Sequence, residues 1–148
     1  MTPTLAGRWQ TRLFLNLTLG VVLSLLFMLI FGLFGRGASD PGFWKLLLLL
    51  AYVTGLGFIW DLIYTFFQSF RWDRDWPLSF VFVQGIIEGI LVFVLFVLNL
   101  LPGVAYQNED WLRFLLDYGS IWWITYWWLF GPMRIIFPQW RFNGGGLI

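Results

Sequence analysis

Long apolar runs dominate the sequence and constrain its fold more than any other feature. A helix needs about 20 apolar residues to cross the ~30 Å hydrocarbon core of a bilayer, and suitable runs occupy 13–34, 43–70, 78–101 and 118–137. Hydrophobic residues make up 59% of the 148 residues and charged residues only 11%, against about 45–50% and about 25% in soluble domains. We therefore expect an all-α membrane protein: one integral-membrane domain, 1–148, forming a four-helix transmembrane bundle with short loops.

The frame of the fourth run is ambiguous. The range 112–131 places Asp117 inside the membrane and ends at Gly131-Pro132, whereas 118–137 keeps Asp117 at the interface and makes Pro132 a kink. We favour 118–137, because a charged acid inside a bilayer is costly. The glycine-rich tail, 138–148, is expected to be mobile.

The positions of the cationic residues predict how the chain is threaded. Four spans put both termini on one side of the membrane, and cationic residues are enriched on the cytoplasmic side. The terminal side would hold Arg8, Arg12, Arg71, Arg74, Arg134 and Arg141, and the other side Arg36, Lys45 and Arg113. We therefore expect both termini in the cytoplasm, in a bacterial-type inner (plasma) membrane or a thylakoid membrane.

Aromatic and cationic residues near the ends of the runs are expected to anchor the bundle. The connection 71–77 is only a few residues long, so the second and third spans should be antiparallel neighbours. Tryptophan prefers the headgroup level, and Arg134 could contact a lipid phosphate there. The expected interface anchors are Arg71, Trp72, Arg74, Trp76 and Arg134.

The chain has no cysteine and no histidine. This excludes disulfides, zinc sites built from these residues, iron–sulfur clusters and His-ligated haem, and it removes the commonest general base. We therefore predict no cofactor, no metal site and no enzymatic activity. The net charge of +1 gives no electrostatic footprint for nucleic acid.

Two acidic residues lie deep within apolar runs. Asp61 is nine residues before Phe70, and Glu88 is nine residues after Ser79. On antiparallel neighbours these offsets correspond to equal depths, about 13 Å inside the boundary at 1.5 Å per residue. The two carboxyl groups could therefore face each other.

Polar and small residues accompany these acids at helical spacing. The second run carries a polar stripe, which should be buried in protein or water, and small residues at four-residue spacing favour close helix packing. The stripe comprises Thr54, Gly57, Asp61, Thr65 and Gln68; the small or polar positions elsewhere are Asn16, Gly20, Ser24, Gly85 and Gly89. The predicted site comprises Asp61, Glu88, Gln84, Ser24 and Tyr126.

Three interpretations of the acids remain open: a proton or cation site, hydrogen bonding between helices of the chain, and contact with another subunit. The function we favour is a small multi-pass accessory, assembly or anchoring subunit that acts by helix packing with partner membrane proteins. The alternative is a homo-oligomeric proton- or cation-coupled transporter or channel that uses Asp61 and Glu88. The expected partners are the lipid bilayer and other membrane-protein subunits, or further copies of the chain.

Overall fold

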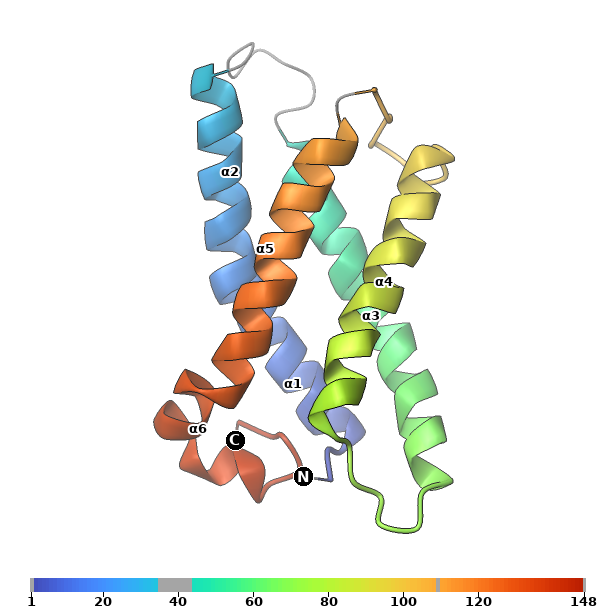
Figure 1. The fold of residues 1–148 in the computed structure, drawn as a ribbon, viewed down its shortest axis with the longest axis vertical. Coiled ribbons are helices and arrows are strands. Elements are labelled where there is room, and N and C mark those ends of the chain that lie inside the picture. The colour runs from blue at the N-terminus through green and yellow to red at the C-terminus, as the bar shows by residue number, and fades with distance from the viewer. Residues whose placement is uncertain (1, 35–43, 109, 148) are drawn as a thin grey trace.

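The computed structural model describes residues 2–34, 44–108 and 110–147, and every regular element in these ranges is a helix (Figure 1). The first helical segment comprises α1 (Leu5–Leu15), a π-helical turn η1 (Asn16–Gly20) and α2 (Val21–Phe34). It begins before the expected start at 13 because the Thr4 hydroxyl caps it, accepting a hydrogen bond from the Gly7 N–H at 3.1 Å.

The remaining elements are α3 (Lys45–Ser69), α4 (Leu78–Val97), α5 (Asp110–Phe130), α6 (Pro132–Ile136) and a short 3₁₀ helix η2 (Pro138–Arg141). Within the described ranges, three helical stretches are long and apolar enough to cross a membrane: 5–33, 45–69 and 79–97. The third expected run, 78–101, is shorter as a helix, because the chain leaves helical geometry at Asn99, where φ is 54°.

The fourth helix does not have the favoured frame, 118–137. It begins at Asp110 and ends at Phe130, and Gly131, with φ −114° and ψ −96°, separates it from α6. Pro132 cannot continue a helix because it lacks an N–H group, but it suits the first turn of a new one. The bounds of this helix are therefore closer to 112–131 than to 118–137.

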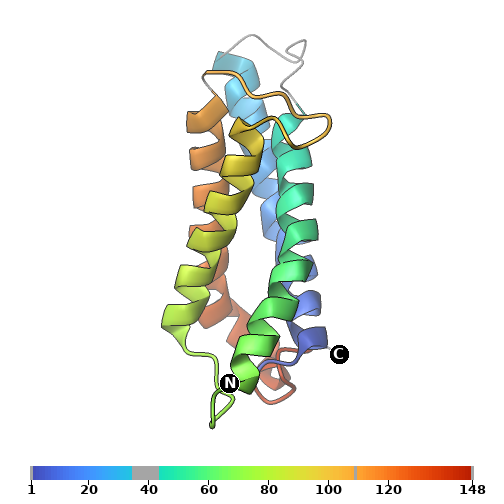
Figure 2. The ribbon, with the colours of Figure 1, turned by 90° about the vertical axis from the view of Figure 1, so that its right-hand side faces the viewer.

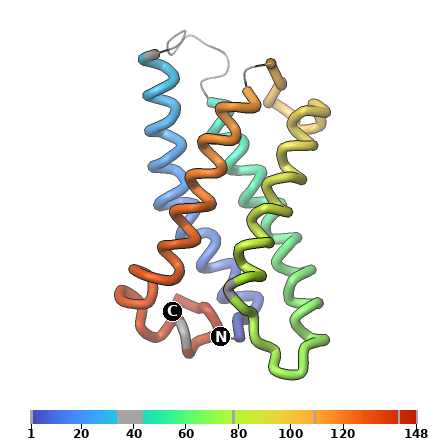
Figure 3. The backbone as a smooth tube through the Cα atoms, viewed as in Figure 1, coloured from blue at the N-terminus to red at the C-terminus, as the bar shows by residue number. Residues whose placement is uncertain are grey.

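The long helices run alternately up and down the bundle, and both termini lie at the same end (Figures 1 and 2). The helix α3 packs against α1, α2 and α4, while α5 packs against α2 and α4. The backbone trace in Figure 3 shows the chain turning at the loop 70–77 and after α4, at 98–108, on opposite ends of the bundle. The short connection 71–77 thus joins antiparallel neighbours, as its length predicts.

The apolar core lies mainly toward the end away from the termini. It is built where the end of α2, the start of α3, the end of α4 and the start of α5 meet. Its buried members are Met28, Leu46, Leu49, Val53, Val92, Phe96, Leu101, Val104 and Phe114. The terminal end is more polar in its interior, and the candidate site lies there.

The described part of the C-terminal tail, 138–147, packs against α1. The Thr11 hydroxyl donates to the Gly145 carbonyl at 2.8 Å and accepts from Trp140 Nε1 at 2.8 Å. The Thr4 N–H donates to the Gly144 carbonyl at 2.7 Å. Glycine permits this approach, since Gly144 has a φ of 58° and the tail backbone lies directly against α1.

Candidate functional site

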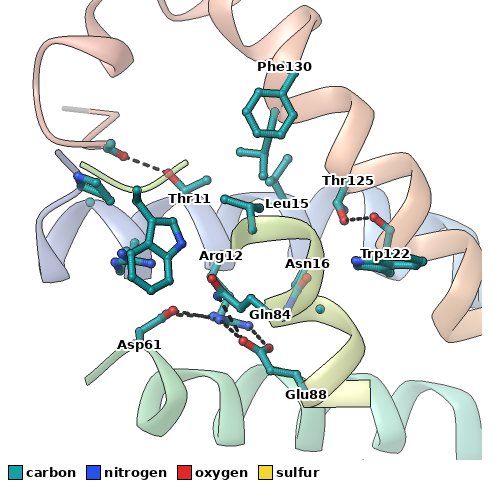
Figure 4. A pocket seen from close by; sticks show the side chains of 18 of the residues that line it. Thr11, Arg12, Leu15, Asn16, Asp61, Gln84, Glu88, Trp122, Thr125 and Phe130 are labelled. Carbon is teal, nitrogen blue, oxygen red and sulfur yellow. Dashed lines mark hydrogen bonds and ion pairs between the residues drawn. The ribbon is translucent and has the colours of Figure 1, made fainter. Parts of the chain in front are cut away.

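Arg12 of α1 lies between the two acids and binds both of them (Figure 4). Its Nε and Nη2 donate to the two Asp61 carboxylate oxygens at 2.9 and 2.8 Å. Its Nη1 and Nη2 donate to the two Glu88 carboxylate oxygens at 2.7 and 2.9 Å. Three helices, α1, α3 and α4, are therefore joined through one guanidinium group.

The residue types match this geometry. A guanidinium is planar and permanently charged, and its fork of N–H groups can bind carboxylates bidentately. The three side chains are well covered, with exposed fractions of 13% for Arg12, 2% for Asp61 and 6% for Glu88. Because burying an unpaired charge is expensive, each member depends on the others. We call Arg12, Asp61 and Glu88 the ion triad.

Neighbouring residues complete the surroundings of the ion triad. Gln84, one turn before Glu88 on α4, donates from Nε2 to Glu88 Oε1 at 3.1 Å. Gly57 of α3 provides the space that the guanidinium occupies, because a Cβ atom at this position would overlap Arg12. Gly57 contributes to the polar stripe because its lack of a side chain leaves room for a charged group.

The polar stripe of α3 faces a matching stripe on the first helical segment. Arg8 Nη2 donates to Gln68 Oε1 at 3.0 Å, on the terminal side of the ion triad. On the other side, Asn16 Nδ2 donates to Thr54 Oγ1 at 2.9 Å. The stripe is buried in protein here, which is one of the two environments that its spacing predicts. Asn16 also begins the π-helical turn, a feature frequent at functional sites.

The predicted site residues separate into two groups. Asp61, Glu88 and Gln84 lie together, whereas Ser24 lies at another polar contact. The Ser24 hydroxyl is fully buried and donates to Asp117 Oδ2 at 3.2 Å. Asp117 is buried, and this contact gives one of its carboxylate oxygens a hydrogen-bond donor inside the bundle.

Tyr126 lies apart from the acids, in an aromatic cluster. Its ring packs against Phe82 of α4 at a centroid distance of 5.5 Å and against Phe130 at 5.0 Å. The glycines of α4 accommodate similar contacts, because a Cβ atom at Gly85 would overlap the Trp122 ring. Gly85 therefore makes room for an aromatic side chain of α5 rather than for the backbone of another helix.

The expected anchors occupy different environments. Trp72 is 96% exposed, and Arg71 pairs with Asp73 at 3.0 Å in the same loop. This hydrogen-bonded guanidinium lowers the pKa of the Asp73 carboxyl. Arg74 has a φ of 48°, and its carbonyl accepts a hydrogen bond from Gln68. The other two expected anchors, Trp76 and Arg134, line a partly open cavity.

The cavity has a volume of about 360 Å³ and lies beside the ion triad. Its wall combines the inner faces of α1, α4 and α5 with the tail residues Trp140 and Gly145. Figure 4 shows Arg12, Asp61, Gln84 and Glu88 on one side of this space and Thr125, Trp122 and Phe130 on another. The volume lies within the range of about 300–1,000 Å³ typical of small-molecule sites.

A second buried ion pair lies at the opposite end of the bundle. Lys45 Nζ donates to Asp110 Oδ2 at 2.8 Å, with exposed side-chain fractions of 10% and 4%. The pair joins the start of α3 to the start of α5. Among the described residues, no group of three or more acidic side chains could hold a metal ion.

Comparison of the chain with protein-family models, with curated proteins and with solved structures gave no match. The site must therefore be interpreted from its own chemistry. All four carboxylate oxygens of the ion triad already accept hydrogen bonds from Arg12. A cation or proton would have to compete with a fixed guanidinium, so the arrangement is best suited to holding helices together.

Arg12 is the central residue that sequence reasoning missed. The first apolar run, 13–34, begins directly after it, and its charge alone places it among the cationic residues of the terminal side. A signal for it exists: Arg8, Arg12, Asn16, Gly20 and Ser24 recur every four residues, which places them near one helix face. Extending the polar stripe of the first span toward the N-terminus would have brought Arg12 toward the depth of the acids.

Proposed function

We propose that the chain is a multi-pass integral-membrane protein with four spanning helices, acting as an accessory, assembly or anchoring subunit through helix packing with partner membrane proteins. The observation that carries this proposal is the ion triad. Its acids have an internal counter-charge and serve to fix α1, α3 and α4. A rigid, internally satisfied bundle is what a packing subunit needs.

The outer surface of the bundle supports a membrane setting. Each long helix exposes large apolar side chains, with exposed fractions between 57% and 73% at the most open positions. These include Leu29 and Leu33 of α2, Ile59 and Phe66 of α3, Ile90 of α4, and Leu115 and Trp127 of α5. Such a surface has to be covered by lipid or by partner helices. The proposed orientation places both termini in the cytoplasm of a bacterial-type inner membrane or a thylakoid.

The face of α5 around Trp123 and Trp127 is the proposed partner contact. These rings are 49% and 58% exposed and pack edge to face at 5.9 Å. Aromatic residues are enriched among the energetically dominant positions of protein interfaces. A pre-packed pair of indole rings offers such a contact with little further loss of side-chain freedom.

The alternative, a proton- or cation-coupled transporter, has less support. It relies on Asp61 and Glu88 as an accessible acid pair, and Arg12 occupies the space between their oxygens. If the alternative holds, Asp61→Asn and Glu88→Gln should abolish flux in proteoliposomes. Flux that persists in both variants would exclude these acids as the transport site.

The proposal is tested by purifying the tagged chain from its native membrane in a mild detergent. We expect a stoichiometric membrane-protein partner, and we expect the double variant Trp123→Ala/Trp127→Ala to lose it. The matched control is Leu62→Ala/Phe66→Ala, which removes two exposed apolar side chains at the same spacing on α3. Isolation of the chain as a defined homo-oligomer would contradict the accessory role. Equal retention by both double variants would exclude the α5 face.

A further inference from the structure

Several residues that line the cavity beside the ion triad carry buried N–H groups without a hydrogen-bond partner. Four side-chain nitrogens of lining residues are buried without a hydrogen-bond partner: Arg8 Nε, Trp76 Nε1, Trp122 Nε1 and Arg134 Nε. All four are N–H donors, and no side-chain oxygen of a lining residue is in this state among the described residues. Buried donors are normally satisfied, so the cavity is suited to a ligand that supplies acceptors.

The wall of the cavity holds three arginines and three acids, so it is the pairing of these charges that favours an anion. The acid that is not part of the ion triad, Asp75, lies in the loop 71–77 and accepts a hydrogen bond from the Trp76 N–H at 2.9 Å. Arg8 and Arg12 together balance Asp61 and Glu88, and the carboxylate oxygens are directed at Arg12. Arg134 has no carboxylate partner within the described ranges. Arginine is well matched to phosphate, because its N–H groups can bind two oxygens at once. The cationic part of the wall therefore offers an oxyanion site.

The Arg8 and Arg134 guanidinium groups are each held in place by an aromatic ring of the same cavity. The Arg8 guanidinium lies over the Trp76 ring at 4.5 Å, and that of Arg134 lies over the Phe130 ring at 5.2 Å. Stacking of this kind orients the cation. Arg8 also donates from Nη2 to Gln68, whereas the Nε atoms of both arginines have no hydrogen-bond partner. The donors are thus positioned before any anion binds.

The rest of the wall is apolar. Leu15, Val81, Ile121, Leu129 and Phe130 line the cavity together with the donors. A purely polar anion would leave these side chains without contacts, whereas an apolar chain attached to the anion would pack against them. The cationic end also lies at the terminal end of the bundle, where the proposed membrane placement puts lipid phosphates.

We propose that this cavity binds an anionic phospholipid, with the phosphate held by Arg8 and Arg134 and the first part of an acyl chain against Ile121 and Leu129. This proposal rests on the proposed membrane placement in one respect only, namely that the membrane supplies the phospholipid. Binding is measured on the isolated chain in detergent, so its failure would not bear on the partner proposal.

The test is native mass spectrometry of the delipidated chain in micelles titrated with phosphatidylglycerol. We expect one lipid to bind at low lipid-to-protein ratio, and Arg8→Gln and Arg134→Gln each to weaken it by about tenfold or more, the effect expected for one charge-assisted hydrogen bond. Arg71→Gln, which removes a loop arginine outside the cavity, is the matched control and should bind as the wild type does. Leu129→Trp, which fills the cavity while keeping both arginines, should also prevent binding.

Three results would overturn the proposal. Phosphatidylcholine could bind as tightly as phosphatidylglycerol, which would show that the net charge is not recognised. Inorganic phosphate could bind as tightly as the lipid, which would show that the acyl chain contributes nothing. The cavity variants could bind phosphatidylglycerol like Arg71→Gln, with thermal unfolding confirming that all of them are folded. Loss of phosphatidylglycerol binding in Leu129→Trp and in both arginine variants, but not in Arg71→Gln, would support the proposal.

Discussion

Arg12→Gln is the substitution expected to damage the fold most. It removes the guanidinium that donates four hydrogen bonds, at 2.7–2.9 Å, to Asp61 and Glu88. A glutamine amide has only two N–H groups and no charge. The variant would therefore leave two carboxylates close together, with side chains only 2% and 6% exposed.

The expected loss of stability in Arg12→Gln follows from the burial of these two carboxylates. Removing one partner of a buried ion pair costs about 3–5 kcal/mol, because an uncompensated charge remains. Proteins are stabilised by only about 5–15 kcal/mol, so this is a large part of the total. At roughly 2–4 °C per kcal/mol for a chain near this size, the melting temperature should fall by about 6–20 °C. Thermal unfolding in mild detergent, followed by the fluorescence of the eleven tryptophans, measures it.

Two further variants make the measurement decisive. Arg71→Gln removes an arginine whose ion pair with Asp73 lies in an exposed loop, and exposed pairs contribute little. The triple variant Arg12→Gln/Asp61→Asn/Glu88→Gln removes all three charges, and it should recover much of the loss because no charge is then left unpaired. If Arg12→Gln melts like Arg71→Gln, or if the triple variant is no more stable than Arg12→Gln alone, the ion triad does not hold the helices together.

Three other substitutions test the remaining polar contacts, each by the same unfolding measurement. Gly57→Ala should destabilise by about 1–3 kcal/mol, as overpacking does, because its Cβ would overlap the Arg12 guanidinium; wild-type stability would show that α1 adapts freely. Asp117→Asn should be neutral or stabilising by about 1 kcal/mol, because Asn can keep the hydroxyl hydrogen bond while a buried carboxylate is removed; a large loss would assign the charge a structural role. Asp110→Asn should destabilise by about 3 kcal/mol, because the Lys45 ammonium would lose its buried counter-charge; an unchanged melting temperature would mean that this ammonium reaches water.

The parts of the fold that follow from local pattern could be predicted from the sequence. Run length and composition indicated an all-helical chain with helices able to cross a membrane, and the helices at 5–33, 45–69 and 79–97 have that character. The short connection 71–77 fixed the relative register of two helices. That register placed Asp61 and Glu88 at one depth, and the structure has both carboxylates on one guanidinium.

The frame of α5 could not be predicted in the same way. The favoured frame kept Asp117 at the interface on the general cost of a buried acid, without knowledge of its partner. That partner, Ser24, is 93 residues away in the sequence, so nothing local to α5 reveals it. The same holds for Lys45 of α3, whose partner Asp110 is 65 residues away in the sequence.

Arg12 shows why a hydropathy boundary and a helix boundary are different quantities. The first apolar run starts after Arg12, but the helix starts at Leu5 and carries Arg12 inward at helical spacing with Asn16 and Ser24. An arginine beside an apolar run has two options: its side chain can extend to water, or it can meet acids at its own depth. Two acids of matching register on neighbouring helices make the second option favourable. In a chain with so few charges, unexplained acids at one depth are therefore a reason to search the adjacent helix ends for the cation that they bind.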